Sequence, residues 1–344
     1  MTWQETPDRT AVYRLIPKVE LHRHLEGSLR LQTLLSVASK HGITLPLKLD
    51  LRSMVQMQEG DPLTYANFLS KFQTLRMFYL SPEVIRRITH EAVEDAANDQ
   101  VRYLELRFTP STLGRPQGFS MKEVMDWVCE SAQKASREFG IITRLIPSVN
   151  RHDDPEIAKE VAGLALERME RGIVALDLAG NEADFPAQPF LETFRRAKAG
   201  GLAITIHAGE WGGAENVRQA LEDFEADRIG HGVRVMEDPQ VVELARQRQT
   251  PFEVCITSNY QSGVVPALSE HPVGRMLAAG LNVTINTDDP SISKITLGDE
   301  YRLVCQDLGL TLEMLQERIL AAARAAFLKP EEKDILIQYL KKSF

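Results

Sequence analysis

Short apolar runs alternate along this chain with longer segments of amphipathic-helix composition, and no other pattern in the sequence limits the choice of fold so strongly. Strands that alternate with helices form parallel βαβ units with right-handed crossovers, and eight such units close into a barrel. We therefore predict an α/β fold, a (β/α)8 TIM barrel, in which residues 1–344 form a single domain. The expected strands are residues 18–22, 103–108, 141–149, 173–178, 202–206, 227–229, 252–255 and 281–286.

An open, doubly wound sheet is the alternative α/β fold, but no Gly-x-Gly-x-x-Gly motif follows the first expected strand. Roughly 80 residues separate the first two strands, whereas a whole βαβ unit needs only ~30. We expect a helical insertion there, on the face of the barrel where such folds build their sites, with helices near residues 29–40, 64–79 and 82–99. Two C-terminal helices are expected within residues 311–344, with a break before Pro330.

Charge and cysteine content indicate which partners and which cellular compartment to expect. A formal net charge of −8 does not suit nucleic-acid binding, which needs a basic surface, and a small molecule is the expected partner. The three cysteines are far apart and form no Cys-x-x-Cys pair, which is typical of a reducing compartment. The polar N-terminus and the absence of a long apolar run predict a cytoplasmic protein without a membrane partner. The oligomeric state stays open.

The run from Val19 to Gly27 carries two histidines at alternate positions. If this run is a strand, His22 and His24 point to the same face, and their imidazoles lie side by side. Imidazole nitrogens suit zinc and its first-row neighbours, but a catalytic metal site needs further ligands from elsewhere in the chain. Taken alone, a surface strand that happens to carry His-x-His explains the pattern equally well.

Four further motifs with polar side chains fall where a barrel places the carboxyl ends of its strands, so these side chains are expected to converge at one face. Three histidines and an aspartate could hold one divalent metal with an open position for water, and a further histidine and acid could move protons. The residues alone thus predict metal-assisted hydrolysis. The motifs are His207-Ala-Gly-Glu210, Ile229-Gly-His-Gly232, Asp177-Leu-Ala-Gly-Asn-Glu182 and Asn286-Thr-Asp-Asp-Pro290. The remaining histidines, His41, His90, His152 and His271, receive no role.

In this order and spacing, the motifs resemble those of the adenosine deaminase family within the amidohydrolase superfamily, over nearly the whole chain. The resemblance implies a (β/α)8 barrel that binds one Zn²⁺ and converts adenosine-type 6-aminopurines to 6-oxopurines with release of ammonia. The activity to expect is hydrolytic deamination of adenosine and 2′-deoxyadenosine to inosine and deoxyinosine, in purine salvage.

The same resemblance implies a role for individual residues. Glu210 would donate a proton to purine N1, and His231 would support the attacking hydroxide and share the proton handling with Asp288. Such an acid has to be protonated in the productive complex, so a raised pKa is expected for Glu210. The implied zinc ligands are His22, His24, His207 and Asp288, with water completing the coordination.

On the substrate side, the resemblance implies that Asp289 hydrogen-bonds N7 and that the Gly180 N–H meets N3, where a residue without a side chain allows close approach. His24 would also contact the substrate. For Glu182, a functional role and simple loop capping are equally good interpretations. Phe68, Leu69 and Phe72 share one helical face, which suits core packing or an apolar wall over a flat purine.

Glu26 departs from the family pattern, in which an aspartate at this position often contacts the ribose 5′-hydroxyl. A longer carboxylate could still reach the ribose, or could reflect a different 5′ substituent or no sugar. The alternative substrates are therefore 6-amino-6-deoxyfutalosine, another 5′-substituted adenosine, and adenine. A catalytically silent nucleoside-binding relative is a further alternative, which predicts the loss of at least one of these residues, and none is missing.

Overall fold

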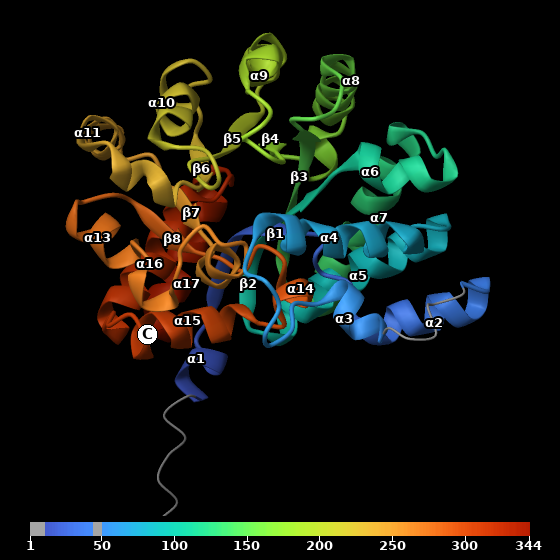
Figure 1. Cartoon of the computed structure of the whole chain (residues 1–344), viewed down its shortest axis with the longest axis horizontal. Coiled ribbons are helices and arrows are strands. Elements are labelled where there is room, and N and C mark those ends of the chain that lie inside the picture. The colour runs from blue at the N-terminus through green and yellow to red at the C-terminus, as the bar shows by residue number, and fades with distance from the viewer. Residues whose placement is uncertain (1–10, 44–49) are drawn as a thin grey trace, which may run out of the picture.

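Eight parallel strands form one sheet whose order follows the chain from β1 to β8, and helices surround it (Figure 1). The structure is a computed structural model that describes residues 11–43 and 50–344. Each strand pairs in parallel with the next, which confirms the predicted (β/α)8 TIM barrel. The strands are β1 Lys18–His24, β2 Val101–Phe108, β3 Ile142–Asn150, β4 Ala175–Ala179, β5 Ala203–Ala208, β6 Arg228–His231, β7 Phe252–Val254 and β8 Val283–Ile285.

The seam between β8 and β1 is closed by the residues that follow β8. The His24 N–H donates to the Asp288 carbonyl at 2.8 Å, and the Asp288 N–H donates to the His22 carbonyl at 3.0 Å. The side chain of Asn286 contributes as well, because its Oδ1 accepts from the Leu21 N–H at 2.9 Å. Closing the barrel therefore places Asp288 beside the two histidines of β1.

The strands read as apolar runs because the barrel interior and the surrounding helices cover both of their faces. All five residues of β4 are buried, as are all residues of β7 and β8. The predicted strands all fall on observed ones, with differences of a few residues at the ends. The most consequential difference is at β1, which runs to His24 and so includes both histidines.

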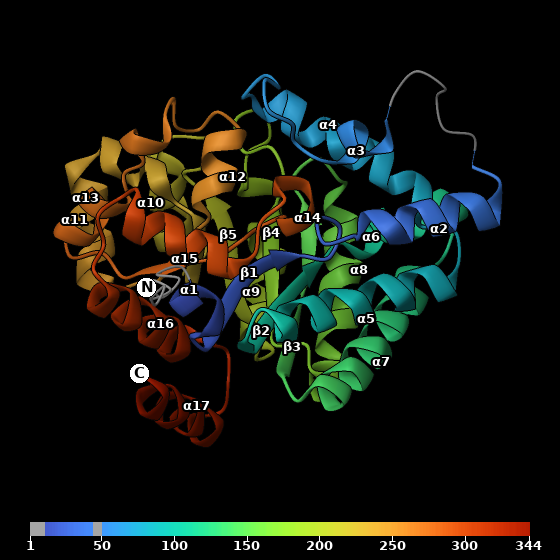
Figure 2. The ribbon, with the colours of Figure 1, turned by 90° about the horizontal axis from the view of Figure 1, so that it is seen from below.

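The long connection between β1 and β2 is helical, as predicted. It contains α2 Leu31–His41, α3 Leu51–Val55, α4 Tyr65–Leu75, the 3-10 helix η1 Arg76–Phe78, and α5 Pro82–Asn98. The short helix α3 was not predicted, because its five residues are too few to show a helical period. The Thr64 side chain caps α4 by accepting from the Asn67 N–H, and Ser81 caps α5. Figure 2 shows α3 and α4 on the side of the barrel opposite the C-terminal helix.

The C-terminal region forms the two predicted helices, α16 Leu312–Ala325 and α17 Pro330–Ser343, with the break at Pro330. Among the described residues, no helix is long and apolar enough to cross a membrane. The other helices are α1 Ala11–Leu15, α6 Pro110–Gly114, α7 Met121–Phe139, α8 Pro155–Leu166, α9 Leu191–Ala199, α10 Ala214–Glu222, α11 Pro239–Arg248, α12 Ile256–Gln261, α13 Val273–Ala278, α14 Pro290–Ser293 and α15 Leu297–Gln306.

The seam offers a test of the fold. Asn286→Ala leaves the Leu21 N–H without its acceptor inside the barrel, and an unpaired buried donor costs about 1–3 kcal/mol. We expect the free energy of unfolding, measured by urea titration, to fall by about this amount. The control is Asn282→Ala, since Asn282 is partly exposed and donates only to the Gln249 carbonyl at 3.2 Å. Equal stability of the two variants would contradict the role of Asn286.

Candidate active site

The four predicted metal ligands converge at the carboxyl ends of the strands. His24 Nε2 lies 3.3 Å from His22 Nε2 and 3.3 Å from His207 Nε2. Asp288 Oδ1 lies 3.3 Å from His22 Nε2 and 3.4 Å from His24 Nε2. The four ligand atoms all lie within 4.8 Å of one another. The structure thus brings together residues that are separated by up to 266 positions in the chain.

These separations fit a small divalent ion. Zinc with bonds of about 2.0–2.1 Å in tetrahedral geometry holds its ligand atoms about 3.3–3.4 Å apart. Three imidazole nitrogens and one carboxylate oxygen are also donors that zinc accepts, and a water would bind by expansion to five-coordinate geometry. The residues present therefore fit the metal that the sequence predicted.

Two of these histidines are held by carboxylates that the sequence analysis did not assign. His22 Nδ1 contacts Glu253 Oε2 at 2.8 Å, and His207 Nδ1 contacts Asp177 Oδ1 at 3.0 Å. A carboxylate acceptor keeps the imidazole hydrogen on Nδ1, so the Nε2 lone pair is free to bind a metal. The structure therefore selects the metal-binding tautomer of both histidines.

The two carboxylates are joined by Arg107. Its Nη1 lies 3.2 Å from Asp177 Oδ1, and its Nη2 donates to Glu253 Oε2 and, at 3.0 Å, to the Leu21 carbonyl. Arg228 binds the other oxygen of Glu253 at 2.5 Å. Burial alone would raise the pKa of Glu253, but the two arginines hold it well below its usual range.

We call this set the buried charge network; its members are Arg107, Arg228, Glu105, Asp177 and Glu253, with Glu105 paired to Arg228. All are nearly or fully buried. Together with Asp288, its carboxylates outnumber its arginines by two. Because a buried charge needs a partner, a divalent cation at the histidines would balance this excess.

A second combination of ligand atoms in the same neighbourhood includes His231 and Cys255. Burial raises the pKa of the Cys255 thiol well above its usual range, so the thiol keeps its proton. The thiol also donates to the Glu253 carbonyl at 3.5 Å. His24, His207 and Asp288 line the same cavity and Cys255 does not, so the three-histidine set is the better metal site.

Glu210 is buried next to the metal ligands. Its Oε2 lies 3.7 Å from His231 Nε2. Burial first, and then the charges of Asp288 and Glu182, raise the pKa of Glu210 well above its usual range. A raised pKa favours the protonated carboxylic acid, which is the form that a proton donor requires.

Glu182 holds the loop that carries Glu210. Its carboxylate accepts from the backbone N–H groups of Gly209 at 3.0 Å, Glu210 at 2.5 Å and Trp211 at 2.8 Å. Asn216 Nδ2 donates to the same carboxylate at 2.8 Å. Of the two interpretations from sequence, loop capping is the one that the geometry favours.

Two of the site residues have strained backbones. His231 has a φ of 57° and Asp288 a φ of 67°, both in the left-handed region that non-glycine residues rarely adopt. Such conformations persist where surrounding structure holds them, often at functional sites. Gly180 has a φ of 94°, which its missing side chain allows.

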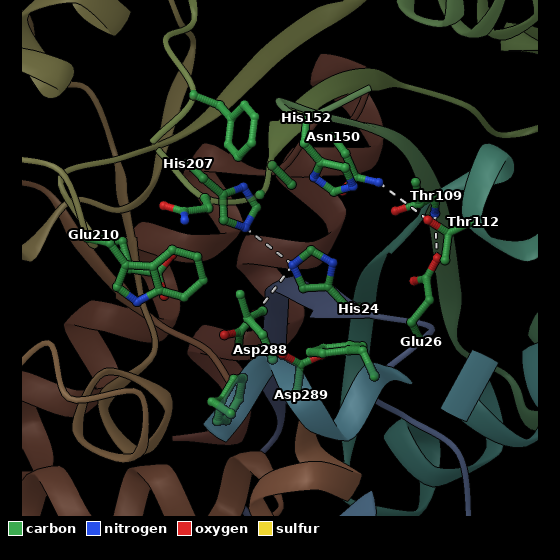
Figure 3. Close-up of a pocket in the computed structure, with 18 of the residues that line it drawn as sticks. His24, Glu26, Thr109, Thr112, Asn150, His152, His207, Glu210, Asp288 and Asp289 are labelled. Atoms are coloured by element: carbon green, nitrogen blue, oxygen red, sulfur yellow. Dashed lines mark hydrogen bonds and ion pairs between the residues drawn. The ribbon is translucent and has the colours of Figure 1, made fainter. Parts of the chain in front are cut away.

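Three of the four predicted metal ligands, His24, His207 and Asp288, line a cavity of about 450 Å³ (Figure 3). Its lining includes every predicted substrate-binding residue, namely His24, Glu26, Phe68, Phe72, Gly180 and Asp289. Phe68 also belongs to the hydrophobic core, and Phe72 packs against it, so this helical face serves core packing while it also borders the cavity. In Figure 3, Glu26 and Glu210 lie on opposite sides of His24.

Two carboxylate oxygens of the cavity lining are buried without a hydrogen-bond partner among the described residues and are available to a ligand. They are Asp289 Oδ1 and Glu26 Oε2, whereas Glu26 Oε1 accepts from the Thr109 N–H at 2.6 Å. Burial raises the pKa of Glu26 to about 6, and burial with three neighbouring acids raises that of Asp289 well above its usual range. A Cβ at Gly27 would lie 1.8 Å from Asp289 Oδ1, so glycine is needed there.

Sequence reasoning missed several residues of the site. Arg107 and Glu253 stand inside predicted strands, and a charged residue inside a predicted strand was the available signal. Arg76, His152 and Trp211 also line the cavity, but they come from the insertion and from loops, whose positions no local pattern predicts.

Comparison with known proteins assigns the chain to a family. The family described as "Adenosine deaminase" matches residues 17–343. The chain belongs to the adenosine deaminase family. It is 36% identical over 330 residues to a protein of Klebsiella pneumoniae named adenosine deaminase, covering 95% of this chain and 98% of that protein. Because the match to proteins named adenosine deaminase covers nearly the whole chain, the chain is a hydrolytic deaminase.

Solved structures agree on the fold. A Burkholderia ambifaria amidohydrolase with bound Zn aligns with a TM-score of 0.89 at 26% identity, covering 98% of this chain and 93% of that chain. An N6-mAMP deaminase of Arabidopsis aligns with a TM-score of 0.87 at 30% identity, covering 96% of this chain and 99% of that chain. Relatives of the same fold therefore differ in the purine that they deaminate.

Neighbouring aspartates provide a matched test of the metal site. Asp288→Ala removes a ligand atom, so we expect the purified protein to lose most of its bound zinc, as measured by elemental analysis and chelator competition. Asp289→Ala removes an equally buried carboxylate that contributes no ligand atom, and it should keep the zinc. Full zinc content in the Asp288 variant would contradict the ligand assignment.

Proposed function

We propose that residues 1–344 form a single-domain, zinc-dependent deaminase that hydrolyses adenosine and 2′-deoxyadenosine to inosine and deoxyinosine with release of ammonia. The observation that carries the proposal is the combination, in one cavity, of a three-histidine, one-aspartate donor set and a buried Glu210 whose pKa is raised. The 36% identity to a curated adenosine deaminase supports the nucleoside as substrate. A cytoplasmic location and a role in purine salvage remain predictions.

The proposed roles follow from chemistry and position. Zinc held by His22, His24, His207 and Asp288 would lower the pKa of a water toward neutrality. Glu210 would protonate N1 as the oxygen adds to C6, which makes the ring carbon more electrophilic. Asp289, with its raised pKa, can donate a hydrogen bond to N7, and the Gly180 backbone N–H would meet N3.

The proposal is tested by ultraviolet-monitored turnover of the zinc-loaded enzyme on adenosine, 2′-deoxyadenosine, adenine, AMP, N6-methyl-AMP and 6-amino-6-deoxyfutalosine, with ammonia release as a second readout. We expect rapid conversion of the two nucleosides. Preference for another compound would identify that compound as the substrate and leave the proposed deamination reaction unchanged. No turnover of any compound would favour a silent nucleoside-binding protein.

Glu210→Gln tests the proton donor. The amide keeps the size of the side chain but cannot deliver a proton to N1, and general acid catalysis contributes about 10²–10⁴-fold. We expect kcat to fall by about this factor while zinc content and fold are retained. Glu215→Gln, at an exposed position of α10, serves as the control. Near-normal kcat in the Glu210 variant would remove Glu210 from this role.

A second candidate substrate class is a purine nucleoside with an anionic 5′ substituent, such as AMP. Arg76 lines the cavity, and its guanidinium makes no hydrogen bond or ion pair with any described residue. Its positive charge acts on Glu26, which places it at the end of the cavity where the ribose is expected. The Arabidopsis relative that deaminates N6-mAMP supports this alternative.

Arg76→Met separates the two classes. If the substrate carries a 5′ phosphate, removing the cation should raise KM for AMP by about tenfold or more, since hydrogen bonds to charged groups contribute about 1.5–3 kcal/mol. If the substrate is adenosine, KM for adenosine should change little. Arg52→Met, at a position of α3 that does not line the cavity, is the control for loss of a charge in the insertion.

A further inference from the structure

His271 is a buried histidine outside the cavity that is linked to His231 through Asn259. His271 Nε2 lies 3.3 Å from Asn259 Oδ1, and Asn259 Nδ2 lies 3.1 Å from His231 Nδ1. The three side chains are between 0% and 6% exposed. The hydrogen bonds therefore form a continuous chain, shielded from water, that ends at a residue of the active site.

The direction of this chain is set at its far end. The Val273 N–H donates to His271 Nδ1 at 3.2 Å, so this nitrogen carries no hydrogen. Burial lowers the pKa of His271 to about 3, so the imidazole is neutral. A neutral imidazole has one N–H, which must then be on Nε2 and point to Asn259 Oδ1.

The opposite orientation of the Asn259 amide is excluded. It would point the NH₂ group at His271 Nε2 and the oxygen at His231. Both nitrogens of His271 would then accept hydrogen bonds, and a neutral imidazole cannot do this because one of its nitrogens carries a hydrogen. Asn259 therefore donates to His231 Nδ1, and this nitrogen accepts.

This hydrogen-bond direction determines which nitrogen of His231 carries the hydrogen in the active site. With an accepting Nδ1, neutral His231 carries its hydrogen on Nε2, which faces Asp288 Oδ2 at 3.8 Å and Glu210 Oε2 at 3.7 Å. We propose that His271 and Asn259 are positioning residues that hold His231 as the Nε2–H tautomer, so that His231 donates a hydrogen bond to the attacking oxygen and does not remove its proton. This inference rests on the proposed deaminase function and narrows the role of His231 within it.

Asn259→Asp reverses the polarity of the chain with almost no change in shape. A carboxylate only accepts, so it keeps the hydrogen bond from His271 and requires a hydrogen on His231 Nδ1. In protein labelled with ¹⁵N-histidine, we expect the NMR signals of His231, assigned from their loss in His231→Gln, to show Nε2–H in the wild type and a hydrogen on Nδ1 in the variant. Because a wrong tautomer of a catalytic histidine can cost up to about 10⁴ in kcat, kcat should fall steeply, with KM much less affected.

A pair of variants at His271 isolates the hydrogen bond from simple packing. His271→Leu removes the donor to Asn259, and we expect mixed tautomers of His231 and a lower kcat. His271→Gln replaces the donor by an amide N–H, and it should restore the Nε2–H signal. Thermal unfolding of both variants shows how far stability alone differs between them.

Three outcomes would overturn the inference. They are a wild-type His231 with its hydrogen on Nδ1, an Asn259→Asp variant that keeps the neutral Nε2–H form, and equal spectra and kcat for the two His271 variants. If Asn259→Asp does not fold, the wild-type spectrum and the His271 pair still decide. The spectra do not depend on turnover, so an enzyme inactive on every purine would refute the proposed function separately.

Discussion

The arrangement of the active site depends on a buried ion-pair contact, between Arg107 and the carboxylates of Asp177 and Glu253. One guanidinium on β2 binds acids on β4 and β7, and each acid in turn orients a histidine, His207 or His22. Buried ion pairs contribute little net stability, because removing charges from water costs about as much as their attraction returns. Here the contact orients the imidazoles, and a divalent cation would balance the remaining negative charge.

Around this centre, burial and neighbouring charges together set the protonation state of each carboxyl group. Glu210 and Asp289 lie in the same cavity as Asp288, and the low dielectric with neighbouring negative charges favours their protonated forms. Glu253, which is equally buried, is ionised because two arginines contact it. Carboxyl groups thus become hydrogen-bond donors or acceptors according to their partners, and this difference would allow one cavity to contain both the proposed proton donor and the proposed metal ligands.

Much of the fold was accessible from the sequence. The alternation of apolar runs and helical segments predicted all eight strands, and the helical insertion was visible from the length of the first connection. The helix α3 and the strand ends were not, since a few residues do not establish a period. For the site, the histidine and aspartate motifs were recognisable by type and position. His271 was not, because its importance comes from two contacts, to Val273 and Asn259, that no local pattern encodes.

The sequence by itself determined the fold class and the residue types available for chemistry, because strand and helix periods and motifs at strand ends are local properties. Tertiary structure alone decided which groups meet. Closure of the β8–β1 seam places Asp288 beside His22 and His24, and the loop capped by Glu182 brings Glu210 to the same cavity. Protonation states and tautomers were decided there too, since they follow from burial and from partners that lie far away in the chain.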